Sequence, residues 1–264
     1  MNTLGSSYNN YSQIRLWGSF GFIISVLSLS LLTNYFGIQI VPICILFFLF
    51  LTFITTLFIK NTSINQKKHN NTFLSIALKP VVIGILLSCF LMQLSHGPFY
   101  AFFAIYLSEN SYSTNSIGFI WILGVIAEIL IFIKISSWIP KFGLEKLFII
   151  SFLFASIRWL LISLFPESVS IVTLATLFHA VTYGMYHAVS ISLIHEYFTG
   201  ELQGRGQALY SSISFGLGGS IGSFYSGYFW ESLGGSAVYL YASLFAFLGL
   251  IVSLILVKSN NTNI

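Results

Sequence analysis

Eight long apolar segments divide this sequence of 264 residues, and they constrain its fold more than any other feature. About 20 apolar residues in a helix cross the roughly 30 Å hydrocarbon core of a bilayer, whereas strands of a membrane β-barrel alternate over about ten residues. These segments are too long and too evenly apolar for such strands. The sequence therefore predicts an all-α membrane protein with eight transmembrane helices. They are expected at approximately 15–34, 38–59, 81–107, 117–138, 147–165, 169–194, 207–230 and 236–257.

The composition agrees with a membrane protein and argues against other classes. Hydrophobic residues make up 56% of the chain and charged residues 7%, and the mean hydropathy is +0.88, far outside the range of soluble domains. Cys44 and Cys89 lie within apolar runs, so they indicate neither a disulfide framework nor a metal site. Despite the net charge of +4, the basic residues do not cluster with exposed aromatic residues, so we expect no nucleic-acid binding. We also expect no cofactor.

The basic residues predict the orientation of the chain. Ten of the eleven Lys and Arg residues fall at segment ends on one side, and this side is cytoplasmic by the positive-inside rule. The polar start NTLGSSYNNYSQ has no basic region and no convincing cleavage site, so the first segment is predicted to be a span and not a signal peptide. We expect a multi-pass protein of the cell (inner, cytoplasmic) membrane with both termini in the cytoplasm. The ten residues are Arg15, Lys60, Lys67, Lys68, Lys79, Lys134, Lys141, Lys146, Arg205 and Lys258.

The longest loop, KNTSINQKKHNNTFLSIALKP, separates two predicted helices from six. Its polar and basic composition favours a solvated linker over a binding site. The predicted organisation is therefore a pair of helices in 1–59, a cytoplasmic central loop in 60–80 and a six-helix bundle in 81–264.

Two opposite charges fall at the same depth of consecutive predicted helices. Glu128 lies eleven residues into the segment that begins at 117, and Arg158 lies eleven residues into the segment that begins at 147, so each is roughly 16 Å deep. A charge at the bilayer centre costs about 2.5 to 3.5 kcal/mol on insertion scales, which the apolar residues of each helix offset. The pair could simply fix helix packing, but buried pairs are weak evidence for stability. Intramembrane ionisable groups more often line a polar cavity or an ion path.

Further polar residues are predicted near this depth. Gln93, His96 and Tyr100 recur at three and four residues in QLSHGPFYAFF, so they share a helix face, and the Gly97-Pro98 step weakens the helix there. We interpret them as candidate cavity-lining residues beside a gate. Taken alone, His96 could equally be a histidine that hydrogen-bonds between helices.

The segment HAVTYGMYH places His179, Tyr183 and His187 four residues apart on another face, with His179 near the midplane. A zinc site is disfavoured, because no HExxH motif occurs and no acidic ligand has suitable spacing.

The glycines of SSISFGLGGSIGSFYSG lie within an apolar span and not at a strand-to-helix turn, so they do not predict a nucleotide site. Gly218, Gly222 and Ser226 have the small-xxx-small spacing that lets membrane helices approach closely, so they are predicted to serve helix packing.

Taken together, five stretches of this sequence resemble the major facilitator superfamily, in the branch of 3-phenylpropionate permease and nucleoside symporter relatives allied to lactose permease. The resemblance covers nearly the whole chain, and the motif order is specific. It implies a helical bundle whose eight spans are helices 5 to 12 of a twelve-helix fold, without the first four. The stretches are YSQIRLWGSFGFI, SHGPFYAFFAIYL, SIGFIWILGVIAEI, FHAVTYGMYHAVSISLIHEYF and LQGRGQALYSSISFGLGGSIGS.

The resemblance also implies site residues. Glu128 is similar to the helix-eight acid of lactose permease, Arg158 to its helix-nine arginine, His179 to its helix-ten histidine and Arg15 to its helix-five substrate-binding arginine. These groups are implicated in sugar binding and proton coupling there. One position departs from that pattern, because Thr182 replaces the proton-bearing glutamate three residues after the histidine.

The expected function is secondary active transport of a small polar or anionic organic solute by proton symport with alternating access. Desolvation favours neutral Glu128 and a nearby guanidinium favours the charged form, so a movement that separates them would couple proton binding to transport. The expected partners are the solute, protons and the lipid bilayer, with a complementary N-terminal half as a further candidate. Two alternatives stay open at this point. They are a truncated, non-transporting remnant or half-transporter, and a membrane-embedded enzyme, for which no GxSxG elbow or metal spacing occurs.

Overall fold

A computed structural model gives the fold of the chain. Across the part that it describes, the backbone is helical with short turns and forms no strand. The prediction of an all-α protein is therefore confirmed. The described residues are 17, 18, 20, 21, 23–25, 28, 29, 31–33, 35–58 and 72–257.

The helices differ in type along the chain. Most are α-helical, but η1, η3 and η4 are π-helical and η2 is a short 3₁₀ helix. The elements are α2 (Ile40–Leu57), α3 (Phe73–Ala77), α4 (Pro80–Glu109), α5 (Thr114–Phe142), α6 (Leu144–Leu164), α7 (Val169–Leu177), η1 (Ala180–Met185), α8 (Tyr186–Tyr197), η2 (Gly200–Leu202), α9 (Gln203–Ser211), η3 (Ser212–Gly218), α10 (Gly219–Val252) and η4 (Ser253–Val257).

Within the described residues, six helical stretches are long and apolar enough to cross a membrane. Every predicted span from 38–59 onward overlaps one of them. The span at 15–34 lies partly outside the described residues, so the count of eight stays a prediction. The six stretches are Ile40–Leu57, Pro80–Glu109, Thr114–Phe142, Leu144–Leu164, Val169–Tyr197 and Gly200–Val257.

The last stretch, Gly200–Val257, contains two predicted spans because the chain reverses at one residue. Gly234 has φ 79° and ψ 159°, a conformation that glycine adopts without steric cost. Before this residue, Gly218 approaches Phe90 and Gly227 approaches Phe102 of α4. After it, Gly249 approaches Leu91 and Leu256 approaches Gly84. One leg of the hairpin therefore runs parallel to α4 and the other antiparallel.

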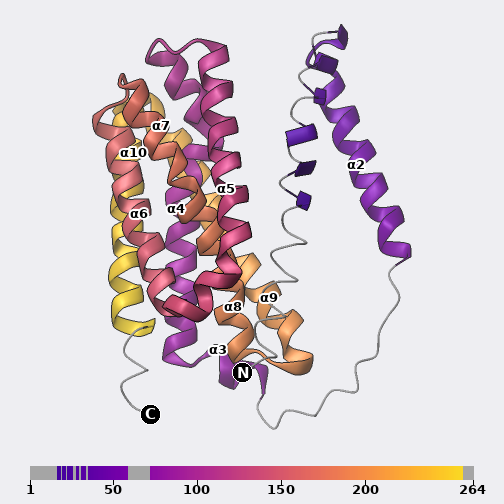
Figure 1. Cartoon of the computed structure of the whole chain (residues 1–264), viewed down its shortest axis with the longest axis vertical. Helices are drawn as coiled ribbons and strands as arrows, with labels where there is room; N and C mark the ends of the chain where they lie inside the picture. Colours follow the sequence, from indigo (N-terminus) through magenta and orange to yellow (C-terminus); the bar gives the residue numbers. More distant parts are fainter. Residues whose placement is uncertain are drawn as a thin grey trace.

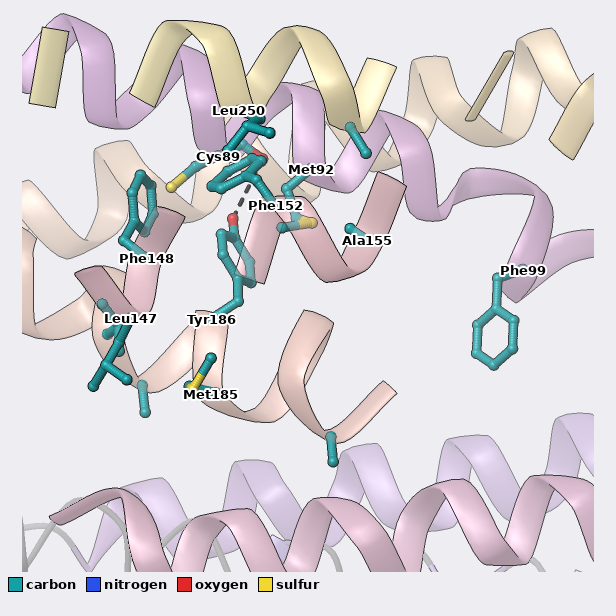
Figure 2. Packing of buried hydrophobic residues seen from close by; sticks show 14 of the residues in the cluster. Cys89, Met92, Phe99, Leu147, Phe148, Phe152, Ala155, Met185, Tyr186 and Leu250 are labelled. Carbon is teal, nitrogen blue, oxygen red and sulfur yellow. Dashed lines mark hydrogen bonds between the residues drawn. The ribbon is translucent and has the colours of Figure 1, made fainter. Parts of the chain in front are cut away.

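The helices from α4 to α10 form one bundle, in which α4 packs against α10, η3, η4 and α8, and α6 packs against α10 (Figure 1). Its apolar core includes Phe148, Phe152 and Tyr186, and the Tyr186 hydroxyl donates a hydrogen bond of 3.3 Å to the Cys89 carbonyl (Figure 2). By contrast, α2 lies apart from this bundle beside the helical residues that precede it, and none of its residues is buried.

A single glycine joins α5 to α6. The side chain of Ser113 caps the start of α5 by accepting a hydrogen bond of 3.2 Å from the Ser116 backbone N–H. Gly143, at φ 82°, ends α5 and precedes the first residue of α6. Because Glu128 and Arg158 are equally far in sequence from this corner, antiparallel packing places them at the same height.

Tyr106 of α4 compensates for a proline at the end of α6. The helical partner of the Ile162 carbonyl would be the N–H of Pro166, which proline lacks. The Tyr106 hydroxyl donates to this carbonyl at 3.1 Å and accepts from the Ser236 hydroxyl at 2.9 Å. It thereby connects α4, α6 and α10.

Tyr106→Phe should lower the free energy of unfolding by about 1 to 2 kcal/mol, because it leaves the Ile162 carbonyl without its donor. Denaturation in mixed micelles measures the change. Tyr228→Phe is the matched control, since the Tyr228 side chain is 70% exposed, and it should leave stability unchanged. Equal stability of the two variants would contradict a structural role for this hydroxyl.

Candidate functional site

Three ionisable side chains from three helical segments form the centre of the candidate site. Glu128 of α5, Arg158 of α6 and His179, which immediately precedes η1, are all buried. His179 lies between the other two, with its Nε2 3.6 Å from Oε2 of Glu128 and its Nδ1 3.1 Å from Nη1 of Arg158. Nη1 of Arg158 also donates to Oγ1 of Thr182 at 3.0 Å. The connection from the acid to the base therefore passes through an imidazole.

The hydrogen bonds define the tautomer of His179. A guanidinium can only donate, so Nδ1 of His179 must accept from Arg158. A neutral imidazole then carries its proton on Nε2, which faces the Glu128 carboxylate. A second proton, on Nδ1, would meet an N–H of Arg158. Full protonation of His179 is thus incompatible with this contact to Arg158.

Local backbone geometry brings Thr182 beside His179. The Phe178 carbonyl accepts hydrogen bonds from the backbone N–H groups of both Val181 (3.0 Å) and Thr182 (2.9 Å), where the α-helical pattern gives way to the π-helical η1. Such π-helical turns are frequent at functional sites. His179 and Thr182 are three residues apart and share a helix face, so both contact Arg158.

Small residues allow α5 to approach α7 and η1 closely around the acid. A Cβ placed on Gly184 would lie 3.1 Å from Cγ of Glu128, and one placed on Gly124 would lie 3.1 Å from Cγ2 of Thr176. Both contacts are tighter than ordinary van der Waals packing. A larger side chain at Gly184 would therefore displace Glu128, and one at Gly124 would displace Thr176.

Aromatic rings surround the Arg158 guanidinium. Its Cζ lies 4.2 Å from the ring centre of Phe99 and 4.1 Å from that of Trp159, distances that allow strong cation–π attraction. Trp159 is itself held by a hydrogen bond of 3.1 Å from its Nε1 to the Ser95 hydroxyl. Nothing in the sequence singled out Phe99 or Trp159, because both lie in apolar runs.

Of the polar residues predicted on α4, the structure brings two to this centre. The His96 ring lies 6.2 Å from that of His179, and its Nδ1 donates to the Met92 carbonyl at 2.8 Å. The half-exposed Tyr100 lies 6.4 Å from His179. Gln93, by contrast, packs against Gly218 of η3.

The side chains of His179, Tyr183 and His187, which were predicted to share a helix face, form a column of rings. His179 and Tyr183 have parallel rings 5.1 Å apart, and Tyr183 and His187 have parallel rings 5.9 Å apart. Nδ1 of His187 lies 3.0 Å from the hydroxyl of Tyr210, a residue of α9 that the sequence did not single out. The column extends from the buried centre to α9.

Gly218 and Gly222 lie against the backbone of α4. A Cβ at Gly218 would lie 2.6 Å from the Phe90 carbonyl oxygen, and one at Gly222 would lie 2.7 Å from the Leu94 oxygen. Ser226 is buried and donates to the Gly222 carbonyl at 2.6 Å. These residues thus form a close contact between η3, α10 and α4.

Two further predictions concern Arg15 and metal binding. Arg15 lies outside the described residues, so its place relative to the site stays a prediction. The part of the chain that the structure describes has no group of three or more His, Cys, Asp or Glu residues able to hold a metal ion.

An all-helical membrane bundle with ionisable groups in contact at its centre has the features of a membrane transporter. Residues 1–241 match the MFS_1 like family. The chain therefore belongs to this family, and it is a multi-pass membrane protein.

Curated relatives agree with this family. The chain is 25% identical over 259 residues to YwbF of Bacillus subtilis (strain 168), described as an uncharacterized transporter, covering 95% of this chain and 63% of that protein. It is 24% identical over 229 residues to a probable 3-phenylpropionic acid transporter of Escherichia coli (strain K12), covering 85% and 60%. It is 24% identical over 264 residues to a maltose permease of Geobacillus stearothermophilus, covering 96% and 64%. The chain thus spans less than two thirds of the length of these relatives.

Proposed function

We propose that this protein moves a small polar or anionic organic solute across the cell membrane by proton symport with alternating access. The observation that carries the proposal is the chain of contacts from Glu128 through His179 to Arg158, which joins α5, α6 and η1. Charged groups that contact one another within a membrane bundle are costly, and they are typical of ion and substrate paths.

Proton binding would change these contacts directly. A charged Glu128 attracts the Nε2 proton of His179, and Arg158 donates to the other ring nitrogen. A proton on Glu128 weakens the first contact, and a proton on Nδ1 of His179 breaks the second. Either event loosens an attachment between two helical segments. Proton binding can thereby shift the balance between two arrangements of the bundle.

The described bundle supports a place for the chain within a longer fold. We propose that residues 1–59 belong to an N-terminal bundle, 60–80 to a cytoplasmic central loop and 81–264 to the C-terminal six-helix bundle, so that the chain corresponds to helices 5 to 12 of twelve. The chain covers 60% to 64% of the length of the three relatives, which agrees with eight helices out of twelve. The basic residues around Lys141 support a cytoplasmic position for the α5–α6 corner and for both termini. A complementary N-terminal half would be the partner.

The relatives suggest two solute classes. One is named for an aromatic acid and another for a sugar. Both classes are consistent with Arg158, because a guanidinium donates hydrogen bonds to carboxylates and to hydroxyls. The resemblance of the sequence to the branch of 3-phenylpropionate permease favours the acid.

Transport assays in proteoliposomes test the proposal. We expect an imposed pH gradient, acid outside and with the membrane potential held at zero, to drive accumulation of radiolabelled 3-phenylpropionate or maltose about tenfold per pH unit for one proton per solute. A protonophore should abolish accumulation while leaving downhill exchange. If folded, reconstituted protein accumulates neither solute under any gradient, the symport proposal is wrong.

A further inference from the structure

The guanidinium of Arg158 uses only part of its hydrogen-bonding capacity. Its Nη1 donates to His179 and Thr182. Its Nε and Nη2 are buried and have no hydrogen-bond partner among the described residues. These two nitrogens share one edge of the planar group, and this edge binds carboxylates with two parallel hydrogen bonds.

Burial makes this edge unusual. Arg158 is 0% exposed, and an N–H group that is buried without an acceptor destabilises a protein. The ring faces of Phe99 and Trp159 stabilise the positive charge. They offer no oxygen lone pair to the N–H groups of the edge. The surroundings therefore compensate for the charge of Arg158 but not for its donors.

We propose that the Nε–Nη2 edge of Arg158 binds the carboxylate of the transported solute, and that Phe99 is the side chain that covers this edge until the solute arrives. The inference rests on the proposed transport function and specifies its substrate class: a monocarboxylate on an apolar, ring-bearing body. A hydroxyl can accept at only one point of the edge, whereas a carboxylate satisfies both nitrogens.

The position of Phe99 suits a cover. It follows the Gly97-Pro98 step of α4, where Pro98 cannot donate to the Leu94 carbonyl and the helix bends more readily. Its ring is buried and lies 4.6 Å from the ring of Trp121 and 5.2 Å from that of His179. A solute ring that displaced Phe99 would replace its contact with the guanidinium. This exchange favours aromatic acids over small aliphatic ones.

Calorimetric titration of the purified chain in lipid nanodiscs tests the inference. The probes are 3-phenylpropionate, benzoate and the uncharged 3-phenylpropanol. We expect both acids to bind, and 3-phenylpropionate to bind at least about tenfold more tightly than the alcohol, because charge-assisted hydrogen bonds are strong. Arg158→Lys keeps the positive charge but loses the pair of N–H donors that bind a carboxylate together. It should therefore weaken acid binding about tenfold and leave alcohol binding unchanged. Arg205→Lys, at an exposed arginine, is the matched control and should bind as the unmodified chain does.

A second variant tests separately whether Phe99 covers the Nε–Nη2 edge. It also provides a test if Arg158→Lys does not fold. Phe99→Leu removes the ring and should tighten 3-phenylpropionate binding at least about threefold. The leucine has no cation–π contact with the guanidinium, so the solute loses less binding energy when it displaces this side chain. Equal affinity for acid and alcohol, failure of both acids to bind, or no change in Phe99→Leu would overturn the inference. Proton-driven uptake of maltose without acid binding would overturn it and leave symport intact. Acid binding that depends on Arg158, without proton-driven uptake, would support it and contradict symport.

Discussion

Gly97→Ala should destabilise the bundle by about 3 kcal/mol, at the upper end of the usual cost of overpacking. A Cβ at this position would overlap the backbone of Gly222, so α4 and α10 would have to separate. No side-chain rotation can relieve a clash between two backbones. The free energy of unfolding, from denaturant titration in mixed micelles, measures the loss.

Gly118→Ala is the matched control for this change. It adds the same methyl group to a helical glycine of α5 where, apart from its chain neighbours and the backbone of its own helix, no heavy atom of the described chain would lie within 4 Å of the new Cβ. Alanine favours helices over glycine by up to about 1 kcal/mol, so this variant should be as stable as the unmodified protein or more so. Similar stability of the Gly97 and Gly118 variants would show that α4 and α10 tolerate a wider separation than the structure implies.

Glu128→Gln should abolish accumulation of solute against its gradient while leaving folding and downhill exchange intact. The amide keeps the size of the side chain but cannot bind and release a proton in the physiological range. A gradient of one pH unit that sustains about tenfold accumulation in the unmodified protein should give a ratio of about one in the variant. Radiolabelled uptake and counterflow in proteoliposomes measure the two activities separately.

Glu201→Gln is the corresponding control, because Glu201 lies on the exposed η2 segment. It should accumulate solute like the unmodified protein. Concentrative uptake by Glu128→Gln would show that the acid is not the coupling group. Loss of exchange together with accumulation would instead indicate a role of Glu128 in solute binding.

Much of the fold follows from hydropathy and helix length. The spans from 38–59 onward were predicted because a membrane helix needs about twenty apolar residues. The common depth of Glu128 and Arg158 was predicted because each lies eleven residues into its segment, and the structure places both beside one histidine. The common depth of the two charged residues can therefore be predicted from the helical rise per residue alone.

Other parts of the site depend on packing that no local pattern encodes. The position of His179 between the acid and the base requires knowing which helices are neighbours. Phe99 and Trp159 carried no signal, because aromatic residues make up 17% of the sequence and most serve lipid-facing or core packing. Gln93 and His96 lie about 60° apart around α4, enough for Gln93 to meet Gly218 while His96 approaches His179.

The reversal at Gly234 links the axial positions of two long helical legs. With one non-helical residue between them, neither leg can slide along its axis without pulling the other. The first leg carries the glycine contact with α4, and the second ends near Gly84 at the far end of α4. A displacement of the first leg beside Gly97 would therefore also move the second leg, whose last turn lies beside Gly84.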